Sequence, residues 1–331
     1  MKALSSIKVS LATASVILCW AYSPTGIHIG LENYSPGHLA LLRFLIASLF
    51  MAGVALAKGI ALPRLRDLPW LFVLGFFAIF LHHVSINYGQ QWVTPGAGSV
   101  LAQSTPLFST LIAYFWLRES VSGWRWLGVL AGFVGVLVVI WGDRGIGTFN
   151  PQGFLIVLAA LSWSIYFALQ KHYAHHYSGL TTVCYMVWAG TLLLCVYLPG
   201  LGQAVTQASL RVNVAVLVLG IFPSALAYLA WAYVLTHSAV SRSAVALYLI
   251  PPVAIVMAAL VLGVGVSPMV LLGGAIVLGS VLALQLEGRK GDTIRGGSVP
   301  RQARPHRGEG ARGMASEELV PQVRPRGADL K

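Results

Sequence analysis

Acidic side chains are scarce in this sequence, and their scarcity points to the class of protein. Only ten of the 331 residues are Asp or Glu, and charged residues make up 10% of the chain, against about 25% in a typical soluble domain. Hydrophobic residues make up 57%, and the mean hydropathy is +0.76. So few charges cannot cover a soluble globule, so we expect a membrane protein that has the lipid bilayer as a partner.

Groups that carry catalysis or bind metals are also sparse. Cys19, Cys184 and Cys195 lie in apolar runs without paired spacing, so we interpret them as small apolar side chains. No nucleophile–base arrangement, metal cluster or phosphate-cradling glycine loop is present, so we expect no enzyme, cofactor or metal site. The stretch "KHYAHHY" places three histidines at helical spacing, but a solvated interfacial loop without nearby carboxylates is favoured over a metal site.

Ten apolar segments have the length of a membrane span, which is about 20 residues. They lack strict alternation, so we expect an all-α membrane protein of ten transmembrane helices rather than a barrel. The first could pass for a signal peptide, but its apolar character continues beyond any plausible cleavage site. The predicted spans lie near Val9–Ile27, His38–Ala57, Trp70–Tyr88, Ala97–Leu117, Trp124–Trp141, Gly153–Gln170, Thr181–Leu198, Asn213–Leu235, Ser243–Leu262 and Pro268–Leu286.

Positive charge is distributed unevenly between the two sets of loops. The net charge of +12 gathers in short loops and in the tail without an aromatic-basic face, which indicates membrane topology rather than nucleic-acid binding. One set of loops holds only Arg144 and Arg211. The other set holds Lys2, Lys8, Lys58, Arg64, Arg66, Arg118, Arg125, Lys171, Arg242, Arg289 and Lys290. This bias predicts a multi-pass protein of the cell inner membrane with both termini in the cytoplasm.

The chain resembles itself after a shift of 145 residues. Without gaps, "VLG" at 73–75 meets "VLG" at 218–220, and Tyr88 meets Tyr233. We therefore expect repeats over residues 1–145 and 146–286, followed by a disordered basic cytoplasmic tail over 287–331. Each repeat holds five predicted helices, an odd number, so the second repeat is inverted in the membrane. In such folds the substrate site lies between the repeats near the midplane.

Prolines occupy corresponding positions in the two repeats. Pro106 meets Pro251 at the same offset, and both fall inside predicted spans. Breaks of this kind are tolerated where the backbone faces protein or a water-filled cavity. The pair predicts bends beside a shared cavity, with a packing kink as the alternative.

Polar residues within spans are candidates for substrate contact. Arg43 lies inside the second span, where a charge needs a partner or a cavity; it could bind an anionic substrate group, or snorkel to one membrane face. In "FLHHVSINYGQ", His83 and Asn87 share a helix face and could bind a polar metabolite, or could join helices. Gln103 meets Tyr248 at the repeat offset, three residues before the paired prolines.

Aromatic residues form the second group of candidates. Trp20 and Trp163 lie early in the first helices of the two repeats. They could contact a flat or apolar substrate, with interfacial belts and core packing as the alternative. The group comprises Trp20, Trp163, Tyr166, Tyr228, Trp231 and Tyr248.

No carboxylate lies in the middle of a predicted span. Before residue 287 the chain has only Glu32, Asp67, Glu119 and Asp143, all in loops or at span boundaries. Proton coupling through a midplane acid is therefore not expected. His82 or His83 could carry a proton instead, and exchange or facilitated diffusion fits equally.

Three stretches carry a resemblance to a known family. "TPLFSTLIAYFWLRESVSGWRWLGVLAGFVGVLVV" resembles the end of a first EamA-type repeat of the drug/metabolite transporter superfamily. "GFLIVLAALSWSIYFALQK" and "SRSAVALYLIPPVAIVMAALVLGVGVSPMVLLGGAIVLGSVL" resemble the start and end of the second. The resemblance implies a secondary carrier in which spans one to four and six to nine surround a central cavity. Spans five and ten would be peripheral, and in relatives they often support homodimers. The chain departs from the family at Gly263-Val264, where Gly-Glu is usual.

These features favour a carrier that moves a small metabolite by alternating access, with an exporter of amino acids or related compounds as the leading hypothesis. A carrier of anionic substrates such as organic or sugar phosphates is one alternative. A scaffold or partner subunit without transport is another, and a wet central cavity would distinguish the carriers from it.

Overall fold

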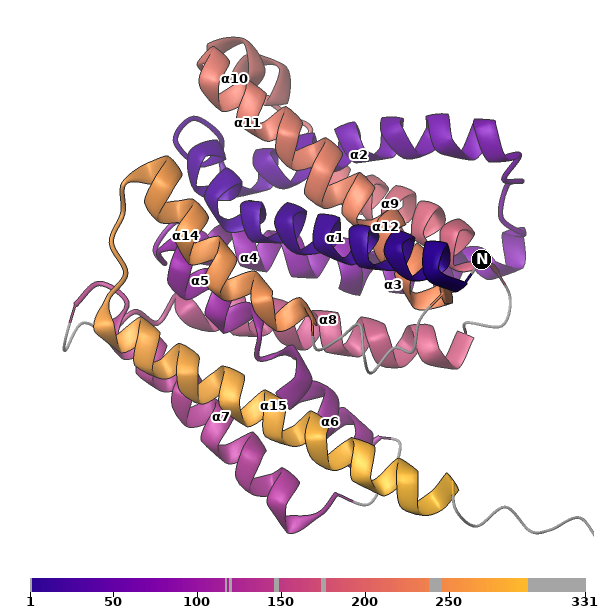
Figure 1. Ribbon diagram of the computed structural model, residues 1–331. Coiled ribbons are helices and arrows are strands. Elements are labelled where there is room, and N and C mark those ends of the chain that lie inside the picture. The colour runs from indigo at the N-terminus through magenta and orange to yellow at the C-terminus, as the bar shows by residue number, and fades with distance from the viewer. Residues whose placement is uncertain are drawn as a thin grey trace, which may run out of the picture. The chain divides into compact units, whose positions relative to one another are not determined.

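The computed structural model describes residues 2–116, 118, 121–145, 149–173, 177–237 and 246–296, and every regular element among them is helical (Figure 1). The first half contains α1 (Lys2–Gly30), α2 (Pro36–Lys58), the 3-10 turn η1 (Leu65–Asp67), α3 (Leu68–Gly75), the π-helical turn η2 (Phe76–Leu81), α4 (His82–Gln90), α5 (Pro95–Ala102), α6 (Thr105–Phe115) and α7 (Gly123–Gly142).

The second half begins after the loop that follows α7. It contains α8 (Gly153–Tyr173), α9 (Gly179–Leu194), the 3-10 turn η3 (Cys195–Tyr197), the short helix α10 (Leu201–Gln207), α11 (Leu210–Ile221), the π-helical turn η4 (Phe222–Leu226), α12 (Ala227–His237), the 3-10 turn η5 (Leu247–Leu249), α14 (Ile250–Leu262) and α15 (Pro268–Gly296).

Seven of the predicted spans appear as helices long and apolar enough to cross a membrane. They run over Ile7–Gly30, Pro36–Lys58, Leu65–Gln90, Gly123–Gly142, Gly153–Gln170, Gly179–Tyr197 and Leu210–His237. The other three differ from the prediction: the fourth is broken into α5 and α6, and the described apolar helices of the ninth and tenth, Leu247–Leu262 and Pro268–Leu284, are shorter. The structure therefore agrees with an all-helical membrane protein, and the count of ten spans stays a prediction.

Serine and threonine caps determine where several helices begin. Ser35, Thr94, Ser122, Ser178 and Ser209 precede α2, α5, α7, α9 and α11 with extended backbone angles, and each side-chain oxygen accepts a bond from the amide three residues on. The first amides of a helix have no partner within the helix. These hydroxyls satisfy one amide in each case, which matters most beside lipid, where water is scarce.

Each half carries a π-helical turn at the same place in the repeat. The turn η2 follows α3, and η4 follows α11, so both interrupt the third long helix of their half. Serine hydroxyls satisfy backbone carbonyls at these turns: Ser162 Oγ donates to Phe77 O at 2.6 Å, and Ser224 Oγ donates to Leu219 O at 2.9 Å. Such turns widen a helix locally and are frequent at functional sites.

The paired prolines begin helices instead of bending continuous ones. Pro106 lies in the first turn of α6, just after the break at Gln103, and Pro251 lies in the first turn of α14, just after η5. Proline lacks an amide donor, and the first turn of a helix leaves that donor without an intrahelical partner anyway. The breaks therefore occur at matching positions, as the sequence predicts, although they are interruptions rather than bends.

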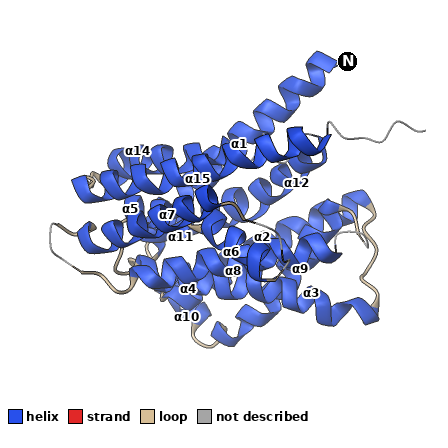
Figure 2. Ribbon diagram, turned by 90° about the horizontal axis from the view of Figure 1, so that it is seen from below, coloured by secondary structure: helices blue, strands red, loops and turns tan. Residues whose placement is uncertain are grey.

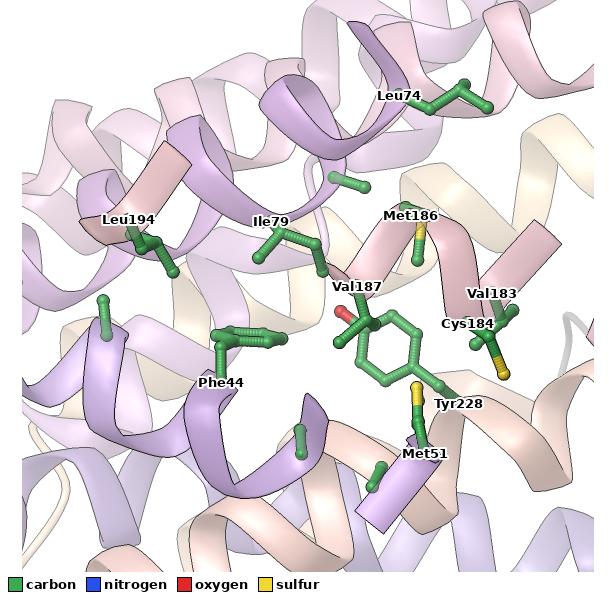
Figure 3. Close-up of a cluster of buried hydrophobic side chains, with 14 of the residues drawn as sticks. Phe44, Met51, Leu74, Ile79, Val183, Cys184, Met186, Val187, Leu194 and Tyr228 are labelled. Atoms are coloured by element: carbon green, nitrogen blue, oxygen red, sulfur yellow. The ribbon is translucent and has the colours of Figure 1, made fainter. Parts of the chain in front are cut away.

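The largest hydrophobic cluster lies where elements from both halves meet (Figure 3). Phe44 and Met51 of α2 face residues of α9, including Val183 and Met186, and Ile79 of η2 packs in the same cluster. These side chains are almost fully buried. The contact joins the second helix of one half to the second helix of the other, so the halves share one core.

Helices α7 and α15 lie side by side (Figures 1 and 2). A Cβ atom on Gly135 would meet the Gly273 carbonyl oxygen at 2.9 Å, and one on Gly273 would meet the Gly135 oxygen at 2.7 Å. Small residues let membrane helices approach this closely, so that van der Waals packing can hold them together.

Part of the predicted tail is helical. Helix α15 continues to Gly296, beyond residue 287 where the predicted tail begins, and the disorder of the tail stays a prediction. Residues 297–331 lie outside the described residues, as do Glu119, His175, His176 and Arg242.

Asp143 joins the end of α7 to the start of α5. It is 5% exposed and accepts from the Thr94 amide at 3.0 Å and from the Thr94 hydroxyl at 2.5 Å. Asp143→Ala leaves both donors without an acceptor and should lower the free energy of unfolding by about 2 kcal/mol. Asp143→Asn retains one acceptor and should lose less. Thermal denaturation in mild detergent measures both variants, and equal losses would contradict this account.

Candidate functional site

A cavity of about 860 Å³ lies between the two halves. Its walls come from α1, α2, α4, α5, α6 and from α8, η4, α12, η5 and α14, and the two helix breaks both contribute to it. Gln103 and Pro106 line it beside one break, and Tyr248 beside the other. The predicted link between the paired breaks and a shared cavity is therefore seen in the geometry.

Eight of the ten predicted substrate-binding residues line this cavity. They are Trp20, Arg43, His83, Gln103, Trp163, Tyr228, Trp231 and Tyr248. They come from seven different elements or segments of the chain, so the fold has gathered residues that the sequence identified separately.

Among the described residues that line the cavity, Arg43 is the only Lys or Arg. Its side chain is 1% exposed, and its Nε donates to Ser224 Oγ at 2.9 Å. Its Nη1 has no hydrogen-bond partner among the described residues. The ion pairs found in the described part of the chain, Arg66–Asp67 and Glu32–Arg211, do not include it. The guanidinium is therefore held by one neutral hydroxyl at the edge of a cavity.

A histidine and a tyrosine meet across the repeat. His83 Nε2 lies 3.2 Å from the Tyr228 hydroxyl, and the two residues are 145 positions apart, which is the repeat offset. The other ring nitrogen of His83 has no partner among the described residues. The neighbouring His82 Nδ1 lies 2.8 Å from the Ala159 carbonyl oxygen, so it is tied to α8. Both histidines line the cavity, and the unpartnered Nδ1 of His83 is buried.

Four aromatic rings form one wall, which we call the aromatic cluster: Trp20, Trp163, Tyr228 and Trp231. Trp20 contacts Tyr228 and Trp231 at centroid distances of 6.0 and 5.9 Å, and Trp163 contacts Tyr228 at 5.8 Å. Trp20 Nε1 donates to the Pro223 carbonyl oxygen at 3.2 Å. Edge-to-face contacts of this kind fix the rings relative to one another, so the wall is apolar and preorganised.

Asn87 and Tyr166 lie away from the cavity. Asn87 is fully buried, and its Nδ2 donates to the Pro36 carbonyl oxygen at 3.1 Å, which joins α4 to α2. Tyr166 packs in the largest hydrophobic cluster and contacts Trp163 at 5.1 Å. For these two residues the geometry fits the alternative interpretations, interhelical hydrogen bonding and core packing.

Sequence reasoning did not identify Ser224 or Gln170. Gln170 lines the cavity near the end of α8. Ser224 is fully buried in η4 and positions Arg43. Ser224 directly follows a proline inside a predicted span, in "FPSAL", and that position could have marked it as a candidate. No local pattern, however, relates it to Arg43, which lies 181 residues earlier.

Carboxylates are absent from the cavity lining of the described chain. Asp67 accepts from the Tyr177 hydroxyl at 2.5 Å, and Glu32 pairs with Arg211 at 3.2 Å. Asp143 accepts from Thr94. All three acids therefore lie at helix ends, in agreement with the expectation drawn from the sequence.

Two tyrosine contacts join the halves at helix ends, and they resemble each other. Tyr34, just before α2, donates to Asn213 near the start of α11. Tyr177, just before α9, donates to Asp67 at the start of α3. Each tyrosine precedes a serine that caps the second long helix of its half, and each acceptor lies at the third long helix of the opposite half. The hydrogen bond to Asp67 raises the pKa of Tyr177 above its ordinary value, so the phenol remains a donor at neutral pH.

The sequence matches the EamA-like transporter family twice, over residues 7–141 and 152–285. The chain belongs to that family. Within the drug/metabolite transporter superfamily, it is thus a multi-pass membrane transport protein, and the resemblance found in the sequence is confirmed.

Several relatives cover most of the chain. "Uncharacterized transporter YdfC" of Bacillus subtilis is 33% identical over 87% of this chain and 94% of its own. A "Probable terminal-alkyne amino-acid exporter" of Streptantibioticus cattleyicolor is 31% identical over 82% of this chain and 92% of its own. A solved crystal structure, 20% identical, covers 85% of this chain and 98% of its own with a TM-score of 0.59, which indicates a shared fold.

Proposed function

We propose that this EamA-family protein exports a small metabolite, an amino acid or a related compound, by alternating access through the cavity between its halves. Its two halves would form ten spans as inverted repeats, residues 1–145 and 146–286, with both termini on the cytoplasmic side of the cell inner membrane. The observation that carries the proposal is the cavity, which both halves build at their paired helix breaks.

Equivalent features of the two halves support the inverted repeat. Both have a π-helical turn within the third long helix and a break before the paired prolines. His83 contacts Tyr228, its equivalent at the offset of 145. Residues related by a two-fold axis can touch each other only where they lie near that axis. The contact therefore fits an axis that passes beside the cavity, as in carriers whose halves exchange conformations.

The two tyrosine contacts supply matching closures at opposite ends. By the distribution of basic residues, the Tyr34–Asn213 contact lies on the outer side and the Tyr177–Asp67 contact on the inner side. Alternating access requires that contacts between the halves break on one side at a time. Each tyrosine contact crosses from one half to the other, so each is suited to that role.

The choice of substrate class and direction rests on the relatives. One relative is named as an amino-acid exporter at 31% identity. A carrier of anionic substrates is the second candidate, because Arg43 presents a buried cation without an acidic partner among the described residues.

Cysteine labelling tests alternating access without knowledge of the substrate. In a chain whose three native cysteines are replaced, Ser99→Cys and Phe167→Cys place single thiols in the cavity. We expect impermeant thiol reagents to label the first from outside and the second from inside, because the two positions lie toward opposite ends of their spans.

A lipid-facing position provides the control for this experiment. Leu49→Cys should stay unlabelled from both sides, because residue 49 is 75% exposed on an apolar span, where the bilayer suppresses thiolate formation. If the cavity thiols also stay unlabelled from both sides, the protein is a sealed scaffold and the transport proposal fails.

A further inference from the structure

The unsatisfied guanidinium of Arg43 is the starting observation. Arg43 lines the cavity and is 1% exposed; its Nε donates to Ser224, and its buried Nη1 has no hydrogen-bond partner among the described residues. A buried charge of this kind is costly unless it is paired. Within the described chain, no acidic residue lines the cavity to offer that pairing.

The missing partner therefore has to arrive with the ligand. A guanidinium presents a planar fork of donors that matches the two oxygens of a carboxylate. The part of the lining that the structure describes has one such cation and no Lys. A single cation balances a single negative charge, which favours a carboxylate over a doubly charged phosphate.

The aromatic cluster provides the rest of the site. The ring centroids of Trp20 and Trp231 lie 5.9 Å apart, and Trp163 lines the same cavity. Preformed apolar walls with a few polar groups are typical of small-molecule sites, and a volume of about 860 Å³ falls in their usual range. A flat apolar body fits this wall while a carboxylate reaches Arg43.

An amino group has no charged partner in this site. The described residues that line the cavity include no carboxylate; besides Arg43, their polar side chains are hydroxyls, amides, the tryptophan indoles and the imidazoles of His82 and His83. A substrate ammonium would gain no ion pair there. We propose that the cavity recognises a monocarboxylate on a flat apolar body, that Arg43 binds the carboxylate, and that an amino group is not required. This inference rests on the proposed transport function and specifies its substrate class.

Four small probes test this selectivity by titration of the intrinsic tryptophan fluorescence in detergent. They are 3-phenylpropionate, its neutral amide 3-phenylpropanamide, the amine phenethylamine, and phenylalanine. We expect the two carboxylates to bind with affinities within about threefold of each other. The amide and the amine should bind about 30-fold more weakly, because a hydrogen-bonded charge pair is lost. Phenyl phosphate is added as a fifth probe to test for phosphate selectivity.

Variants of Arg43 separate recognition from folding. Arg43→Gln should reduce 3-phenylpropionate binding to the level of the amide and leave amide binding unchanged, a pattern that general damage to the site would not give. Ser224→Ala releases Nε and should weaken carboxylate binding severalfold. It also keeps the test available if Arg43→Gln does not fold.

Several outcomes would overturn the inference. These are equal binding of acid and amine, carboxylate binding that survives in Arg43→Gln, selective binding of phenyl phosphate, or no binding by any probe. Each leaves the transport proposal standing, because thiol accessibility decides that proposal independently of the substrate.

Discussion

Joining residue 34 to residue 213 with a bifunctional thiol reagent is expected to stop transport almost completely. The variant is Tyr34→Cys/Asn213→Cys in the chain without native cysteines. Tyr34 and Asn213 touch in the structure, and they come from opposite halves. A covalent link at this position prevents the outer ends of the halves from separating, so the outward-open state of an alternating-access cycle cannot form.

The inner contact should behave in the same way. Linking residue 177 to residue 67 in Tyr177→Cys/Asp67→Cys holds the inner ends together. Counterflow of radiolabelled phenylalanine in proteoliposomes measures the loss, and cleavage of a reducible linker should restore flux. Labelling of a cavity thiol gives a second measurement, because it should be lost only from the side that is linked.

A link within one half is the matched control. Asn213 Nδ2 donates to the Ala208 carbonyl oxygen at 3.4 Å, and both residues belong to the second half. Cross-linking should not change the transport rate of Ala208→Cys/Asn213→Cys relative to the same variant without the linker, because the pair does not separate in the cycle. Full activity in either linked pair between the halves would contradict the assignment of the tyrosine contacts to gating.

Valine at either of two equivalent glycines is expected to destabilise the protein strongly. Gly75 of α3 and Gly220 of α11 are 145 residues apart. A Cβ on Gly75 would meet the Gly190 amide nitrogen at 2.6 Å, and one on Gly220 would meet Ile46 Cβ at 2.7 Å. Backbone atoms and a Cβ atom cannot move aside as a side-chain end can. We expect about 3 kcal/mol of destabilisation, and a melting temperature lower by roughly 10 °C.

A third glycine separates this effect from helix propensity. Gly53 lies inside α2, and a Cβ there meets nothing within 4 Å. Gly53→Val should therefore leave the melting temperature, measured by fluorescence-detected gel filtration, almost unchanged. Similar losses at all three positions would show that valine itself, and not the close approach of helices, is responsible.

Local properties of the sequence determined the class of protein and most helix positions. Composition excluded a soluble globule, and seven predicted spans match helices within a few residues. The repeat offset located the paired breaks, because Pro106 and Pro251 can be seen in the sequence without knowledge of contacts. A charged residue inside a span, such as Arg43, is costly in lipid, so it was predicted to face a cavity. Aromatic residues such as Trp20 were predicted from their positions in the repeats.

Tertiary structure decided which face each span turns toward the cavity. His83 and Asn87 share a helix face, yet of the two only His83 lines the cavity. The side-chain amide of Asn87 instead donates to the Pro36 carbonyl oxygen. Arg43 is held by Ser224, 181 residues away. Spans are apolar on every side, so hydrophobic periodicity does not distinguish lipid from cavity or core. Only the packing of distant helices makes that distinction, and it buries one guanidinium nitrogen of Arg43 without a hydrogen-bond partner among the described residues.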